Sequence, residues 1–96
     1  MDLLNKLENV KDEDSFLEFL SALAADRADE EEKEKKSPSN PWGPGHNGWE
    51  NGTIAQFLEA MSDWAEGSKN GLPLMEKEEN PWKRCADILY MGKIYE

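Results

Sequence analysis

The side chains best placed to do chemistry are three carboxylates, Glu59, Asp63 and Glu66, at positions i, i+4 and i+7. On a helix this spacing brings them within about 60° of one another, nearly opposite the apolar residues of the same segment. With Glu50 they are the four acidic residues of residues 37–66, a segment without Lys or Arg. Like charges at this spacing repel by roughly 0.2–0.5 kcal/mol. The pattern indicates either a surface that receives Lys and Arg side chains of a partner or a plain solvated helix face.

Two tryptophans, Trp42 and Trp49, flank a short segment rich in Gly and Pro, which predicts a loop. Tryptophan is enriched among the residues that dominate binding energy at protein interfaces. We therefore expect Trp42 or Trp49 to anchor the rim of a binding surface. The alternative, for Trp49 above all, is that the ring packs over the helices and enlarges a small core.

Catalytic and metal chemistry have little support in the sequence. His46 is the only histidine and has no ligand partner at a metal-binding spacing, so we expect an exposed loop residue. Cys85, the only cysteine, falls on the apolar face of a predicted helix and is expected to be buried by packing. A Gly-rich phosphate loop, a Ser/His/Asp set and an HExxH motif are all missing. The expectation is a protein that is not an enzyme and holds no cofactor or metal.

The composition narrows the class of partner. The 96 residues include 21 acidic and 11 basic side chains, for a formal charge of −10. This charge disfavours direct contact with nucleic acid or membrane lipid and favours a basic protein. No apolar run approaches the roughly 18 residues of a membrane span. Because the start also lacks a signal-peptide pattern, we expect a cytoplasmic protein.

Only five residues are β-branched, which favours an all-α fold. We expect a small three-helix bundle. The alternative that residues 3–7 form a short additional N-terminal helix stays open. The first main helix should begin at the N-cap Asp12, or near Ser15, and end near Ala28. Its apolar face comprises Phe16, Leu17, Phe19, Leu20, Leu23 and Ala24.

Residues 29–48 begin with a run of charge and continue with three prolines and three glycines. The composition predicts a long mobile loop, acidic at first and then rich in Pro and Gly. This loop would lie inside a single domain that spans residues 1–96.

Two further helices are expected after this loop. One starts at Asn51 or Thr53 and stops at Gly67, with the apolar stripe Ile54, Phe57, Leu58, Met61 and Trp64. The other starts at Asn80-Pro81 and stops at Gly92, with the apolar face Trp82, Cys85, Ala86 and Leu89. Residues 68–79 between them are expected to form a loop.

Several pieces of the chain together show a family resemblance. They are Trp49-Glu50-Asn51-Gly52-Thr53-Ile54 running into Phe57-Leu58-Glu59-Ala60 and then Trp64, Pro81-Trp82 with Ala86 and Leu89, Val10 followed by Phe16-Leu17 and Phe19-Leu20, and the final Tyr95-Glu96. This pattern resembles a family of short uncharacterised bacterial proteins, known as a domain of unknown function, over most of the chain except the loop. This family has no known activity, so the resemblance implies none for this chain. Small acidic proteins of this kind often act as immunity proteins beside bacterial toxins.

These observations lead to a functional hypothesis and an alternative. We expect a cytoplasmic bacterial protein, of the immunity-protein kind, that occludes a basic toxin such as a nuclease. Its carboxylates would pair with Lys or Arg around the active site of the toxin. The alternative is a stand-alone structural or regulatory domain whose apolar faces complete one another in a homodimer.

Overall fold

The computed structural model, which describes residues 2–69 and 78–96, confirms the all-α fold class. The four helices are α1 (Leu3–Glu8), α2 (Glu13–Lys36), α3 (Ile54–Ser68) and α4 (Pro81–Ile94), and the described residues contain no strand. The short N-terminal helix that the sequence left open is therefore present. Of the loop expected at residues 68–79, residues 70–77 lie outside the described residues.

The predicted N-caps of the three longer helices are confirmed. Asp12, Thr53 and Asn80 each accept a hydrogen bond from the backbone of the following turn. At Asp12 the bond from the Ser15 backbone N–H is 2.9 Å long, and bonds from Ser15 hold the pKa of the Asp12 carboxyl below its usual value. Because capping depends only on residues within one turn, it is visible in the sequence.

Helix α2 is longer than predicted. It continues past Ala28 to Lys36, so residues 29–36 are helix and the expectation of a loop there is wrong. The charge run stabilises the helix instead of ending it, because charges of opposite sign meet on adjacent turns. The Lys33 ammonium lies 2.8 Å from the Asp29 carboxylate, and the last turn carries three lysines that suit the negative end of the helix dipole.

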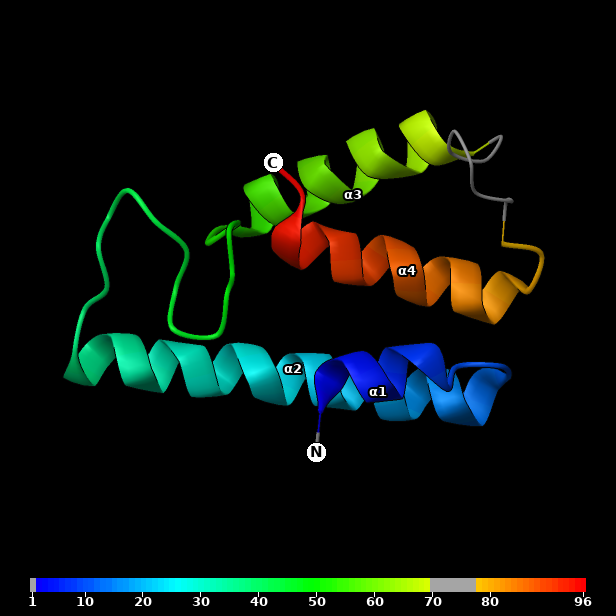
Figure 1. Cartoon of the computed structure of the whole chain (residues 1–96), viewed down its shortest axis with the longest axis horizontal. Coiled ribbons are helices and arrows are strands. Elements are labelled where there is room, and N and C mark those ends of the chain that lie inside the picture. The colour runs from blue at the N-terminus through cyan, green and yellow to red at the C-terminus, as the bar shows by residue number, and fades with distance from the viewer. Residues whose placement is uncertain (1, 70–77) are drawn as a thin grey trace.

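Helix α4 is the centre of the arrangement. Figure 1 shows α1 and α2 side by side, with α4 between them and α3. Helix α4 contacts all three other helices, whereas α3 contacts α4 alone among the described helices. Because α3 and α2 do not touch, the three longer helices do not close around a common axis. Within the described residues, no helix is both long enough and apolar enough to cross a membrane.

The apolar core forms where α1, α2 and α4 meet. Its buried members are Leu7, Val10, Phe19, Leu23, Trp49 and Ala86. The predicted apolar face of α2 is too wide, since Leu17, Leu20 and Ala24 are exposed. Cys85 is also exposed, contrary to prediction, although it shares a stripe of α4 with the buried Gly92. The core is thus smaller than the apolar pattern of the sequence suggests.

Gly92 does not end α4, as the sequence predicted, but lies buried inside it. A Cβ atom at this position would lie 2.7 Å from both Met61 Cγ and Phe57 Cε1 of α3. The glycine therefore permits the close approach of α3 to α4. Gly67 likewise lies inside its helix, which ends at Ser68, and a Cβ there would meet no atom of the described residues within 4 Å.

Alanine at these two glycines should have opposite effects on the free energy of unfolding. Gly92→Ala should destabilise the protein by about 1–3 kcal/mol, because the methyl group forces α3 away from α4. Gly67→Ala should stabilise it by roughly 0.5–1 kcal/mol, because alanine favours helix and no neighbour obstructs it. Urea unfolding followed by circular dichroism measures both. Effects of the same sign would contradict this account of the packing.

Candidate protein-interaction surface

Trp49 fastens the segment before α3 to both α2 and α4. The ring is only 7% exposed, and its indole N–H donates to the Asp26 carboxylate at 2.9 Å. The Lys93 ammonium donates to the same oxygen at 2.7 Å. The Arg27 guanidinium and the Lys93 ammonium lie 5.2 and 5.6 Å from the ring centroid, at cation–π distance. Trp49 is therefore a core residue. Its ring is too buried to anchor the rim of a binding surface, which is the role that we expected for it.

Glu30 holds the second half of the predicted loop on α2. Its buried carboxylate accepts hydrogen bonds from the backbone N–H groups of Asn47 and Trp49 at 3.0 and 3.3 Å. It also accepts one from Arg27 Nη1 at 2.9 Å. A side chain at Gly45 would clash with this carboxylate, so glycine allows the loop to come this close. Residues 45–49 are thus docked on α2 by specific bonds.

His46 is exposed, as expected, and joins the loop to the end of α2. Its Nε2 atom lies 3.3 Å from Glu34 Oε2 and also contacts the Ser37 carbonyl oxygen. Hydrogen bonds from the Ser39 backbone and hydroxyl hold the pKa of the Glu34 carboxyl below its usual value. In the part of the chain that the structure describes, no group of three or more His, Cys, Asp or Glu residues is arranged to hold a metal ion.

The sequence analysis missed the polar residues of this junction, although a signal was present. Asp26 and Glu30 continue the helical stripe of Phe19 and Leu23, at i+7 and i+11 from Phe19. Charged residues on the core-facing stripe of a helix indicate buried polar contacts. Nothing local to Lys93 marks it as their partner, since the contact joins residues far apart in the sequence.

The three predicted carboxylates of α3 are all exposed, on the side away from α4. Glu66 lies 3.5 Å from the Lys69 ammonium, and both side chains are mostly in solvent, so this pair contributes little. Among the described residues, Glu59 and Asp63 have no ion-pair partner. The acidic stripe is therefore available to basic groups from outside.

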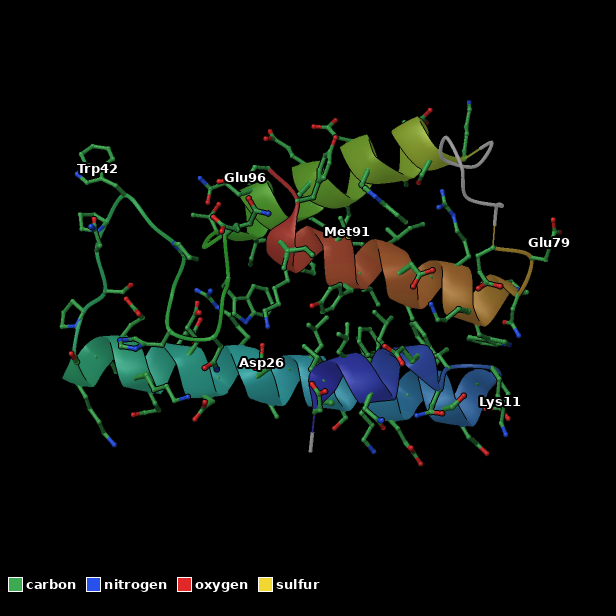
Figure 2. All side chains as sticks on the ribbon, viewed as in Figure 1. Lys11, Asp26, Trp42, Glu79, Met91 and Glu96 are labelled. Carbon is green, nitrogen blue, oxygen red and sulfur yellow. The ribbon has the colours of Figure 1, made fainter. Side chains whose placement is uncertain are left out.

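Glu50 extends this acidic surface beyond the start of α3. Partial burial and the neighbouring Glu96 carboxylate raise the pKa of Glu50. Glu96 itself lines a shallow depression of about 110 Å³ together with Glu59 and Asp63. Figure 2 shows Glu96 close to the first turn of α3. The last residues of the described chain thus bring a fifth carboxylate to the four that the sequence singled out.

Trp42 is 92% exposed. Figure 2 shows it at the outer end of the loop, directed away from the helices. The structure therefore leaves Trp42 free for an interaction but does not place it in the depression beside Glu59 and Asp63.

Two apolar side chains of α3 are also exposed, on a different side of the helix from the acidic stripe. Ile54 and Leu58 are 80% and 55% exposed, so their predicted place on a buried face is wrong. The cause is that α3 packs against one helix, which covers only the side that carries Phe57 and Trp64. Helix α3 therefore exposes uncompensated carboxylates on one side and large apolar groups on another.

Residues 12–96 match the model of a protein family described as "Family of unknown function (DUF7660)". The chain belongs to this family. The match begins at the N-cap of α2 and includes the Trp49 junction and the acidic surface. Comparison with curated proteins and with solved structures finds no match. The resemblance to an uncharacterised family is confirmed, and the family description contains no activity.

Removing one member of the Asp26–Lys93 pair should cost more than removing both. Asp26→Leu leaves the buried Lys93 ammonium without a counter-charge and should destabilise the protein by about 3 kcal/mol. The double variant Asp26→Leu/Lys93→Met should lose less than the sum of the single losses. Urea unfolding of the four proteins gives the coupling energy. Strictly additive losses would mean that the contact does not tie the helices together.

Glu50→Gln should raise the melting temperature at pH 7. The folded pKa of Glu50 is raised from its ordinary value of 4.5, so its ionisation opposes folding. Below the ordinary pKa Glu50 is protonated and wild type keeps its full stability, which is then lost as the pH rises through the raised folded pKa. The difference between variant and wild type should therefore vanish near pH 3. The exposed Glu8→Gln on α1 controls for the change in net charge, and an equal rise in that variant would contradict the prediction.

Proposed function

We propose that this chain is a non-enzymatic protein-binding module that holds a basic protein against α3. The observation that carries the proposal is the exposed acidic stripe of α3, in which Glu59 and Asp63 have no ion-pair partner among the described residues. Glu66, Glu50 and Glu96 enlarge the negative area. A partner with a cluster of Lys and Arg complements this surface in charge.

The two kinds of side chain contribute differently to binding. Exposed ion pairs are worth about 0–1 kcal/mol each, so carboxylates alone would hold a partner weakly. The formal charge of −10 mainly accelerates the encounter with a basic protein. Burial of a large apolar side chain supplies roughly 1.5–3 kcal/mol and slows dissociation. A partner that also covers the exposed Leu58, on another side of α3, would gain this apolar contribution.

A cytoplasmic bacterial immunity protein is the biological role that suits this surface best. A toxin such as a nuclease gathers Lys and Arg around its active site to meet phosphates. Carboxylates at helical spacing would compete for the same basic groups and block access. Direct contact with nucleic acid or a membrane forms no part of the proposal, because both are anionic.

Affinity capture from the native cells tests the proposal. The triple variant Glu59→Lys/Asp63→Lys/Glu66→Lys is compared with wild type and with a matched control. The control reverses three exposed acids away from α3, Glu8, Asp14 and Glu79, and so changes the net charge equally. We expect wild type and control to retain one basic protein at low salt and to lose it at high salt, as screening predicts. The α3 variant should lose the partner and keep its helical circular dichroism spectrum.

Two outcomes would overturn this assignment. Equal retention by the α3 variant would exclude the acidic stripe as the binding surface. Recovery of the chain itself as the sole partner, with a sedimentation mass above that of a monomer, would favour the homodimeric structural domain.

A further inference from the structure

Asparagine is followed by glycine at three places in the chain. The pairs are Asn47-Gly48, Asn51-Gly52 and Asn70-Gly71, and the last of them lies outside the described residues. Asparagine is among the chemically labile residues, and it loses its side-chain amide most readily before glycine, which has no side chain to obstruct the reaction. The structure holds the reacting groups of the two described pairs in different ways.

The reaction at such a pair consumes only water. The backbone nitrogen of the glycine loses its proton and bonds to the side-chain carbonyl carbon of the asparagine, Cγ. The bond from Cγ to Nδ2 breaks, and Nδ2 leaves as ammonia. Water then opens the cyclic imide at either carbonyl group, which gives aspartate or isoaspartate. In sum, an amide and a water become a carboxylate and an ammonium ion.

At Asn51-Gly52 the glycine nitrogen is held by the first turn of α3. The Gly52 N–H donates to Gln56 Oε1 at 3.1 Å, and the Gln56 N–H donates to Thr53 Oγ1, also at 3.1 Å. These reciprocal bonds resemble a capping box. The Gly52 nitrogen must leave Gln56 before it can attack Asn51. Because Gln56 is exposed, water competes for this bond, and it opens readily.

The fold itself does not require a glycine at position 52. A Cβ atom there would meet no atom of the described residues within 4 Å, and the φ angle of Gly52 is not in the left-handed region. Alanine can therefore replace Gly52 without strain. This substitution separates the reactivity of Asn51 from the stability of the fold.

The pair Asn47-Gly48 is held more firmly. The Asn47 amide donates to the Asp26 carbonyl oxygen and to the Asp29 carboxylate, both at 3.0 Å. The Gly48 N–H donates to the Gly45 carbonyl oxygen at 2.9 Å, and Gly48 has a φ of +83°. Asn47 is therefore an internal reference that should react more slowly than Asn51.

The Asn51 amide joins the start of α3 to the end of α4. Its Nδ2 atom donates to the carbonyl oxygens of Gly92 and Tyr95, each at 2.8 Å. Figure 1 shows the end of the chain beside the first turn of α3. A carboxylate in place of this amide has no proton to donate, so it would repel both carbonyl oxygens. It would also lie at the negative end of the α4 dipole, in the same depression as the Glu96 carboxylate.

We propose that Asn51-Gly52 is a deamidation site whose rate is set by the hydrogen bond from Gly52 to Gln56. The product releases the end of α4 from the start of α3. Since the reaction does not reverse, it limits the lifetime of the folded chain. The proposal does not depend on the identity of any partner.

Incubation of the full chain at pH 8 in heavy-oxygen water measures the reaction. Mass spectrometry of its peptides, with fragmentation, assigns each new carboxylate to one asparagine. We expect faster deamidation at Asn51 than at Asn47. Gln56→Ala should accelerate the reaction at Asn51 by about threefold to tenfold, the factor that one hydrogen bond supplies, and leave Asn47 unchanged. Ile54→Ala, an exposed truncation in the same turn, is the control and should leave both rates unchanged.

Two further variants test the site and the effect of its product. Gly52→Ala should slow deamidation at Asn51 by about tenfold or more, with an unchanged circular dichroism spectrum, because the methyl group obstructs the backbone nitrogen. Asn51→Asp should lower the melting temperature by about 5 °C or more. Gln56→Glu adds the same charge in the same depression but keeps an acceptor for the Gly52 N–H, so it should lower the melting temperature less.

Three outcomes would overturn the proposal. Equal rates at Asn51 in wild type, Gln56→Ala and Gly52→Ala would exclude the site. Equal acceleration at Asn47 and Asn51 in Gln56→Ala would mean that the whole fold had loosened, and would exclude control by Gln56. Equal melting temperatures of Asn51→Asp and Gln56→Glu would exclude the release of α4. Each of these outcomes leaves the acidic stripe of α3 untouched as a binding surface.

Discussion

The shared hydrogen bonding of the Asp26 carboxylate to Trp49 and Lys93 is the contact on which the arrangement depends. It joins α2, the segment before α3, and the last turn of α4 at one point. Helix α3 has no direct contact with α2, so its position relative to α2 is set by α4 and by this junction. The apolar core is too small to make such a polar contact dispensable.

This junction also explains why so much of α3 meets solvent. A helix held against a single neighbour buries one side, here through Gly92 of α4, and exposes the others. The exposed sides carry Glu59 and Asp63 on one stripe and Ile54 and Leu58 on another. The same arrangement that limits the core thus leaves both charged and apolar side chains in solvent, on different sides of α3.

The candidate site was predictable only where it depends on one helix. The exposure of Glu59, Asp63 and Glu66 follows from their spacing and their charge, whichever side of α3 is packed. The two tryptophans could not be assigned in the same way. Trp49 is buried because Asp26, Lys93 and Arg27 surround it, and these residues are distant in the sequence. Trp42, seven residues earlier in the same loop, meets no such set and stays in solvent.

The sequence by itself determined the helical class and the N-caps at Asp12, Thr53 and Asn80, because propensity and capping act within one turn. The charged residues whose ion pairs extend α2 to Lys36 are also present in the sequence, but a search for apolar periodicity does not detect them. Only the tertiary structure decided that Gly92 is a packing position, that Cys85 and Ile54 are exposed, and that Asp26 and Lys93 pair. Each of these outcomes depends on which helix lies opposite. A stripe of apolar residues predicts that one side of a helix can be buried, but it does not specify which element buries it.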